Sequence, residues 1–249
     1  MSMSDDRPPL PEEVVTTDLR PQFHAELDEI REDIARMAAR VTEAIPRATE
    51  ILLTQDLEGA AYLVEADGEL DRKAFELEER CYSVIARQSP VARDLRAVVS
   101  ALRIIAEVER SGDLAVNVCK AARRMYGHQL DPALRGIIQK MGDQAQHLFK
   151  EATEAYLNSD ASRATAIADM DGYLDDLQRQ FVQAIFEADA SRKIELQVAV
   201  QLAVVARFYE RIGDHAVNIG ERTRYVVEGW GDLDQGATHV TRAAASDLD

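Results

Sequence analysis

Hydrophobic residues recur every three or four positions over most of the chain, and this spacing predicts long α-helices. In the first such segment the apolar positions are Leu27, Ile30, Ile34, Met37, Val41 and Ile45. Pro46 and Pro90 are the only prolines between positions 22 and 131, and no proline follows Pro132. A β-sandwich or barrel needs turn residues about every 8–12 positions. The pattern therefore predicts an all-α fold.

Six helices fit this pattern, at about 19–56, 59–87, 90–127, 132–159, 161–188 and 191–229. Ser89 and Asp131 each precede a proline, which predicts that they cap the third and fourth helices. Pro46 is expected to kink or break the first helix, because proline has no backbone N–H and clashes with the preceding turn. Residues 1–18 and 230–249 lack helical periodicity and are predicted to be flexible extensions.

The chain contains an internal repeat. Residues 109–118 read ERSGDLAVNV and residues 210–219 read ERIGDHAVNI, with seven of ten positions identical at an offset of 101. A fainter match upstream pairs DGELD at 67–71 with DGYLD at 171–175. Each half therefore has the same motifs on its second and third helices, which predicts two similar three-helix bundles, 19–128 and 131–229.

Both repeated motifs contain acidic residues four positions apart, which places each pair on one helix face. The apolar stripe of the third helix, if continued, reaches the acids at 109 and 113, and that of the sixth reaches the acids at 210 and 214. The stripes of the second and fifth helices run back to the acids at 67 and 171. The predicted core positions are Leu95, Val98, Val99, Leu102, Ile105 and Ala106 in the third helix, Leu196, Ala199, Val200, Ala203 and Ala206 in the sixth, Leu70, Ala74, Leu77 and Cys81 in the second, and Leu174, Leu177 and Phe181 in the fifth. Buried like charges repel unless a cation lies between them, and carboxylates suit Mg, Mn, Ca or iron. The predicted metal ligands are Asp67, Asp71, Glu109 and Asp113 in the first half and Asp171, Asp175, Glu210 and Asp214 in the second.

Other residues of the repeat support the same hypothesis. Gly112 and Gly213 each cost about 1 kcal/mol relative to alanine inside a helix, so close approach of a neighbouring helix or ion is expected there. Asn117 and Asn218 are candidates for contacts just outside the metal ligands. The alternatives are a solvated acidic face at the bundle rim, tight helix packing at the glycines, and helix-to-helix hydrogen bonds from the asparagines.

Arg110 and Arg211 are expected to form surface salt bridges. Cys81 and Cys119 are expected to be small buried side chains. His215 matches Leu114 in the other copy, so it is interpreted as incidental.

The 249 residues include 45 acidic and 29 basic ones, a net charge of −16. Such an excess of acid argues against binding of nucleic acid, and no apolar run of about 20 residues predicts a membrane span. The two cysteines are too few for a disulfide scaffold, and no basic segment followed by an apolar one marks a signal peptide at the start. The chain is therefore expected to be soluble and cytoplasmic. No histidine follows a glutamate at the di-iron spacing, and no phosphate loop or nucleophile motif occurs. No catalytic residue is predicted.

The duplicated ERxGDxAVN segment, the aspartates upstream of it and the Asp94-Leu95-Arg96 element together resemble the PhoU family of bacterial phosphate-signalling proteins, whose actinobacterial members are often called PhoY. The resemblance covers about residues 19–229 and implies two three-helix bundles, each with a multinuclear metal cluster. Glu109/Asp113 and Glu210/Asp214 match the metal motif of the family, and Asp67/Asp71 and Asp171/Asp175 match its companion. The second half departs from the family pattern at Glu195-Leu196-Gln197, where Asp-Leu-Arg is missing.

This resemblance implies a negative regulator and not an enzyme. The implied partners are the ATPase subunit of the phosphate ABC transporter and a sensor histidine kinase. Through these partners the protein would keep the phosphate-starvation regulon off. A homodimer is a further arrangement to test, while nucleic acid and direct membrane insertion are not expected. The implied ions are divalent or trivalent, among them iron, Mn, Mg and Zn. Two alternatives remain: a carboxylate-bridged metalloenzyme that hydrolyses phosphate esters, and a metal-free helical adaptor.

Overall fold

The computed structural model describes residues 21–229, and this part of the chain contains six α-helices and no β-strand. The helices are α1 (Pro21–Thr54), α2 (Leu57–Gln88), α3 (Ala92–Arg124), α4 (Pro132–Asn158), α5 (Ala161–Ala190) and α6 (Leu196–Glu228). The prediction of an all-α fold with six helices is confirmed. The predicted extensions, 1–18 and 230–249, lie outside the described residues. Among the helices described, none combines the length and apolar character that crossing a membrane requires.

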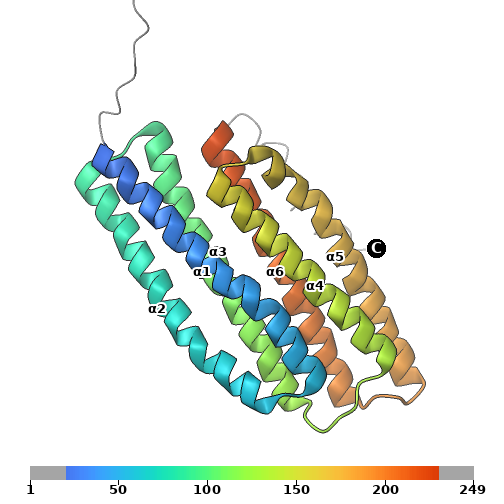
Figure 1. The fold of residues 1–249 in the computed structure, drawn as a ribbon. Helices are drawn as coiled ribbons and strands as arrows, with labels where there is room; N and C mark the ends of the chain where they lie inside the picture. Colours follow the sequence, from blue (N-terminus) through green and yellow to red (C-terminus); the bar gives the residue numbers. More distant parts are fainter. Residues whose placement is uncertain (1–20, 230–249) are drawn as a thin grey trace, which may run out of the picture.

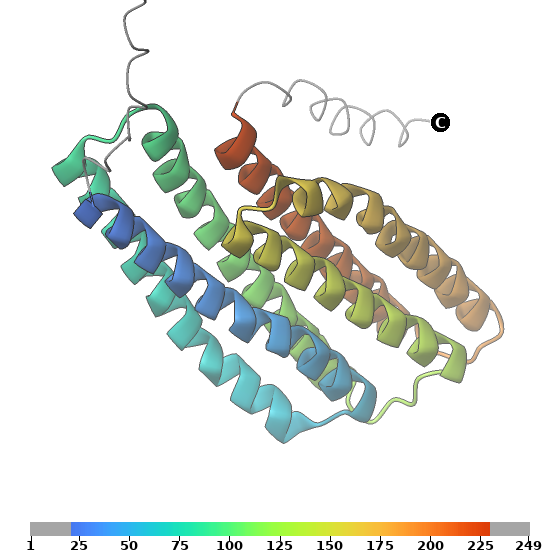
Figure 2. The same ribbon diagram turned by 45° about the horizontal axis from the view of Figure 1, so that its top comes forward.

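Two three-helix bundles lie side by side (Figures 1 and 2). Helices α1, α2 and α3 form the first bundle, and α4, α5 and α6 form the second. The bundles meet where α1 packs against α4 and where α3 packs against α6, while α2 and α5 lie on the outer flanks. The repeat seen in the sequence therefore corresponds to a repeat in space.

Aspartate side chains start three of the helices. Asp56 accepts a hydrogen bond from the backbone N–H of Gly59, and Asp131 accepts one from Ala133, with Pro132 in the first turn. Such caps satisfy amides that have no partner within the helix. Asp160 caps α5 in the same way. The prediction for Asp131 is thus confirmed.

The prediction that Ser89 caps the third helix is wrong. Ser89 ends α2 instead: its backbone has left-handed geometry (φ 45°) and its N–H donates to the carbonyl of Ile85. A residue in this conformation cannot also supply the extended geometry of an N-cap. Helix α3 consequently begins two residues later than the sequence signal suggests, after Val91, which makes no side-chain cap hydrogen bond.

The predicted kink or break at Pro46 does not end α1, which runs through this residue without interruption. Proline leaves the carbonyl four residues earlier without its helical partner, and that carbonyl belongs to Thr42. The side chain of Gln146 on α4 donates to it through Nε2 at 3.2 Å. A residue of the second bundle therefore supplies the hydrogen bond that proline removes from the first.

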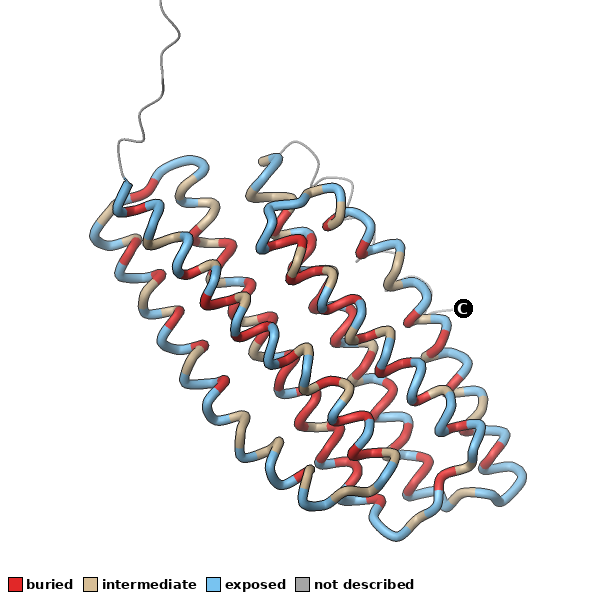
Figure 3. Tube along the Cα trace, in the orientation of Figure 1, coloured by how far each residue is buried: buried red, intermediate tan, exposed pale blue. Residues whose placement is uncertain are grey.

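Buried residues line the helix faces that point inward (Figure 3). The predicted core positions of α1, α2 and α5 are confirmed, but the stripe predicted for α3 and α6 is partly wrong. Leu95, Leu196 and Val200 are 39%, 71% and 52% exposed. Helix α3 contacts α1, α2 and α6, and α6 contacts α3, α4 and α5. With neighbours on several sides, these helices carry apolar residues over a wide arc, and one stripe does not identify the inner face.

A buried hydrogen bond joins the two bundles near the middle of the core. The hydroxyl groups of Thr49 on α1 and Tyr209 on α6 lie 2.8 Å apart, and both residues are 1% exposed. Gly142 on α4 faces Thr49 so closely that an added Cβ would lie 2.3 Å from Thr49 Oγ1. Helices α1, α4 and α6 therefore meet at a point with no free space.

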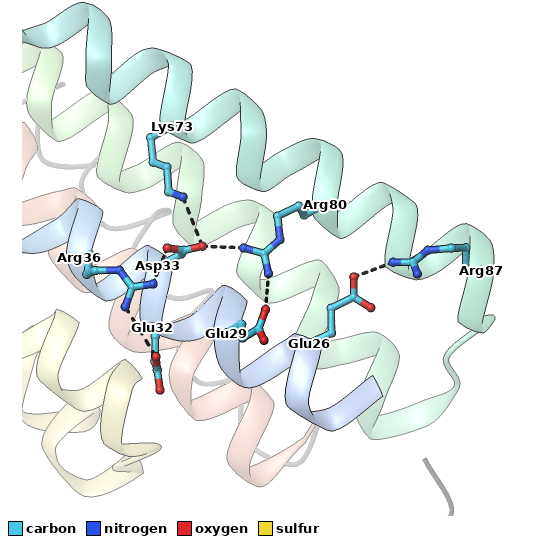
Figure 4. A network of polar contacts seen from close by, with 8 residues as sticks. All are labelled: Glu26, Glu29, Glu32, Asp33, Arg36, Lys73, Arg80 and Arg87. Atoms are coloured by element: carbon cyan, nitrogen blue, oxygen red, sulfur yellow. Dashed lines mark hydrogen bonds and ion pairs between the residues drawn. The ribbon is translucent and has the colours of Figure 1, made fainter. Parts of the chain in front are cut away.

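Ion pairs attach α2 to α1 along their outer edge (Figure 4). At the centre of this network is Asp33, which is 8% exposed. Arg36 and Arg80 each approach its carboxylate to 2.6 Å, and Lys73 approaches to 3.3 Å. Burial alone would raise the pKa of Asp33, but the hydrogen bonds and charges of Arg36 and Lys73 outweigh it and lower the pKa.

Candidate metal centres

The structure brings the four predicted acids of the first bundle into one electrostatic group between α2 and α3. Burial first, and then the charges of Asp71 and Asp113, raise the pKa of Asp67 to about 6 against the opposing charge of Lys120. Burial also raises the pKa of Glu109, as do the charges of Asp113, Asp71 and Asp67. These carboxylates lie close enough to disfavour one another's ionised form.

The second bundle repeats this arrangement between α5 and α6. Burial first, and then the charges of Asp175, Asp214 and Glu210, raise the pKa of Asp171 to about 7. The pKa of Glu210 is also raised to about 7, first by burial and then by the charge of Asp214. Burial raises the pKa of Asp214 as well. In both bundles burial and mutual repulsion outweigh the nearby cations, Lys120 in the first and Arg207 and Arg211 in the second. The core stripe predicts buried acids, but none of the eight is fully buried, and Asp71, Asp113 and Asp214 are exposed.

One oxygen in the second set has no partner. Oε1 of Glu210 accepts a hydrogen bond from Arg207, whereas Oε2 is buried with no hydrogen-bond partner in the structure. A buried carboxylate oxygen without a partner carries a desolvation cost, which a bound cation would offset. Sequence reasoning missed Arg207, because Ala106 occupies the matching position of the first half.

Glycines allow the helices to approach each other beside both sets of acids. An added Cβ at Gly112 would lie 2.3 Å from Leu70 Cδ2. At Gly213 it would lie 2.4 Å from Asp171 Oδ1 and 2.8 Å from Leu174 Cδ2. Real Cβ atoms do not approach other atoms so closely, so a residue larger than glycine would force the side chain of Leu70, or those of Asp171 and Leu174, to move.

A cavity gives access to the first set. It has a volume of about 300 Å³, lies between α1, α2 and α3, and reaches Asp67 and Gly112. Arg40, Arg47 and Tyr62 also line it. An ion could reach the first set of acids from solvent along this side of the bundle.

The donor atoms fit hard cations. All eight predicted ligands are carboxylates, the ligand type that Mg, Mn and Ca prefer. Burial raises the pKa of the Cys81 and Cys119 thiols to about 12, so no thiolate is available at neutral pH. Within residues 21–229, no three His, Cys, Asp or Glu side chains are yet gathered tightly enough to hold an ion. The acids would have to close around a cation.

His215 is not incidental. Its ring Nδ1 lies 2.6 Å from Glu107 Oε2, and both side chains are buried at the contact between α3 and α6. Arg110 forms an ion pair of 2.6 Å with the other oxygen of Glu107, which agrees with the predicted salt bridge. Burial alone would raise the pKa of Glu107, but His215 and Arg110 lower it. This contact was missed because Leu114 and Phe208 occupy the matching positions.

The two asparagines lie in different surroundings. Asn218 lines a groove between α3 and α6 together with Arg110 and Arg222. Asn117 is partly buried on α3. Whether either residue contacts a bound ion stays a prediction.

Comparison with known proteins identifies relatives over most of the chain. The PhoU domain model matches residues 34–122 and 138–223, one copy in each bundle. The protein of Mycobacterium tuberculosis named phosphate-specific transport system accessory protein PhoU homolog 2 is 34% identical over 212 residues, which cover 85% of this chain and 99% of the relative. A PhoU homolog of Pseudomonas putida is 29% identical over 234 residues, covering 92% of this chain and 90% of the relative.

Solved structures agree with this fold. The crystal structure of PhoU from Pseudomonas aeruginosa superposes with a TM-score of 0.79 and 28% identity, and covers 84% of this chain and 100% of that one. PhoU from Streptococcus pneumoniae has the same fold, with a TM-score of 0.77, 24% identity, and coverage of 84% of this chain and 98% of that one.

Proposed function

The chain belongs to the PhoU family, and on this premise we propose that it is a cytoplasmic negative regulator of phosphate uptake and of the phosphate-starvation regulon. Its relatives are named accessory proteins of phosphate transport, and the same association is assigned to this chain. In the finer form of the proposal, the protein links the ATPase subunit of the phosphate ABC transporter to a sensor histidine kinase. It acts by binding and not by catalysis.

The observation that carries this proposal is the presence of a PhoU domain in each bundle, together with relatives aligned over nearly their whole length. The function attached to those relatives therefore concerns the whole described fold and not one part of it. The physics of the carboxylate sets supports an ion-binding protein; the association with phosphate comes from the relatives alone.

We also propose that each carboxylate set binds metal. A bound cation would supply positive charge between the acids and would join α2 to α3 in the first bundle and α5 to α6 in the second. Asp67, Asp71, Glu109 and Asp113 would hold it in one bundle, and their four counterparts would hold it in the other. The unpartnered Glu210 Oε2 and the raised pKa values of Asp67 and Asp171 support this assignment.

The regulatory proposal is tested by deleting the gene in its host and following a phosphate-starvation reporter in phosphate-rich medium. The reporter should switch on, return to silence when the wild-type gene is restored, and stay silent when the kinase gene is also removed. If the reporter remains silent after every PhoU-family gene of the host has been deleted, the regulatory proposal is wrong.

The metal proposal is tested separately, by elemental analysis of the purified full-length protein. Asp113→Asn and Asp214→Asn should each lower the metal content of one bundle, and the double variant should lower both. Asp169→Asn serves as the matched control, because this exposed residue lies on α5 outside the carboxylate set. Equal metal content in the double variant and the control would show that the acids do not hold the ions.

A further inference from the structure

Helix α3 presents a row of arginines. Arg96, Arg103 and Arg110 follow one another at intervals of seven residues, which places them on one helix face about 10 Å apart. Arg222 of α6 lies across from this row, in the same groove as Arg103 and Arg110. Four guanidinium groups therefore border the contact between the two bundles.

The groove beside this row has a volume of about 440 Å³ and lies between α2, α3 and α6. Val99, Leu102 and Ala106 supply its apolar lining. Tyr82 on α2 stands at its edge and is 53% exposed. Its two acidic residues are Glu78 and Glu107, and Glu107 is already paired with Arg110 and His215. The groove thus combines apolar surface with an excess of positive charge.

Donor side chains of the groove are available to a ligand. Within residues 21–229, Arg103 and Arg222 take part in no ion pair or hydrogen bond of the structure. Next along the row, Arg96 Nε and Ser100 Oγ are buried and have no hydrogen-bond partner. These two atoms lie below the surface and outside the groove lining, so the donors that a ligand meets are the guanidinium groups of Arg103 and Arg222.

The charge of this surface contrasts with that of the whole molecule. Helix α3 contains seven basic and four acidic residues, in a chain whose net charge is −16. The second bundle does not repeat the row, because Gln197 and Val204 occupy the positions that match Arg96 and Arg103. The arginine row is therefore a feature of the first bundle and not a consequence of the repeat.

We propose that this groove binds an extended acidic segment of a partner protein. The arginine row advances about 10 Å per step, and a peptide in the polyproline II conformation advances about 3.1 Å per residue with three residues per turn, so that every third side chain lies on the same face. Acidic side chains three residues apart would therefore meet successive arginines, while apolar side chains between them would contact Val99 and Leu102. A single phosphate ion is too small to span this row. The inference rests on the proposed function only in requiring that the protein acts through partner proteins.

The test is the binding of fluorescein-labelled poly-L-glutamate of 20 residues to the purified full-length protein, measured by fluorescence anisotropy. A chain of charge −16 repels a polyanion except at a local basic surface, so binding reports on such a surface. Arg103→Glu and Arg222→Glu should each weaken binding ~10-fold, because each replaces an attraction with a repulsion. Arg103→Lys should retain most of the affinity.

Arg123→Glu is the matched control, since Arg123 is an exposed arginine of the same helix about 30 Å from Arg103. Its affinity should stay close to that of the wild type, and circular dichroism should show that all variants fold. Absent binding, or equal losses at Arg123 and Arg103, would overturn the proposal. So would displacement of the peptide by inorganic phosphate at constant ionic strength, which indicates an ion site.

Two other occupants are tested with the same protein. If sedimentation shows that the wild type is a dimer and that Arg103→Glu is a monomer, the groove would be assigned to a second copy of the chain. A large gain in poly-glutamate affinity on removal of residues 230–249 would assign it to the chain's own C-terminal segment. Either result would overturn the proposal. All of these measurements are independent of the phosphate-starvation reporter, so failure here leaves the regulatory proposal to its own test.

Discussion

Replacing Gly142 with alanine tests how tightly the two bundles are joined. The new Cβ would lie 2.3 Å from Thr49 Oγ1, 2.9 Å from its Cγ2 and 3.1 Å from its Cβ. Thr49 cannot rotate away without loss, because its hydroxyl group donates to the carbonyl of Ile45 or pairs with the hydroxyl of Tyr209. Tyr209 is 1% exposed, so water does not replace a lost partner.

The expected cost follows from three contributions. Overpacking of a filled core costs about 1–3 kcal/mol. A buried hydroxyl left without a partner costs a further ~1–3 kcal/mol. Alanine in place of glycine inside a helix returns about 1 kcal/mol. Because Thr49 either stays and clashes or moves and loses its partner, only one of the two costs of about 1–3 kcal/mol applies, and the 2.3 Å approach places it in the upper part of that range. After the gain of about 1 kcal/mol from alanine, Gly142→Ala should lower the free energy of unfolding by about 1–2 kcal/mol.

Urea unfolding of the full-length protein, followed by circular dichroism at the helix band, measures this change, provided that the slope against urea is unchanged. The thermal midpoint should fall by ~2–4 °C for each kcal/mol in a chain of this size.

A double variant separates the steric explanation from others. Thr49→Ala removes both the hydroxyl and the methyl group that the new Cβ would meet, so Gly142→Ala should cost little or nothing in that background. An equal cost in both backgrounds, or a Gly142→Ala protein at least as stable as the wild type, would refute the reasoning.

Three further predictions concern other contacts. Asp33→Asn should lower the free energy of unfolding at pH 7 by about 1 kcal/mol, a modest loss because the cationic partners of Asp33 are partly exposed. The folded pKa of Asp33 is lowered from 3.8, so its stabilising effect is present above pH 4 and disappears as the pH falls through the folded pKa. The urea midpoints of the variant and the wild type should therefore converge in acid. Gln146→Ala should cost about 0.5–1.5 kcal/mol by removing the donor to the Thr42 carbonyl, and an equal cost in a Pro46→Ala background, where the helical N–H is restored, would contradict this. Gly213→Ala should lower the metal content of the second bundle only, and an unchanged ratio of metal to protein would show that close approach there is not needed.

The sequence predicts the carboxylate sets because they are repeated. Acids four residues apart are common in a chain with 45 acidic residues, but the same pairs on matching helices of two halves indicate a shared role. The contacts that break the repeat were missed for the same reason. The contacts of His215 with Glu107 and of Arg207 with Glu210 have no counterpart in the other half, and neither do Arg96 and Arg103 of the arginine row.

Helix ends were less predictable than helix existence. Asp131 followed by Pro132 starts α4 as the sequence predicts, whereas Ser89 followed by Pro90 ends α2. A polar residue before proline can therefore either start a helix or end one.

The sequence by itself determined the helical class, the two repeats and the acidic pairs, because these depend on spacing along one helix and on comparison of the chain with itself. Only the tertiary structure decided which helices meet across the two repeats. It therefore also decided which side chains outside the repeated motifs form hydrogen bonds with each other. Gln146 restores the hydrogen bond lost at Pro46, Tyr209 binds Thr49, and His215 binds Glu107. Each pair joins residues about 100 or more positions apart, and no periodicity within a helix specifies which side chains of two distant helices come within hydrogen-bond distance.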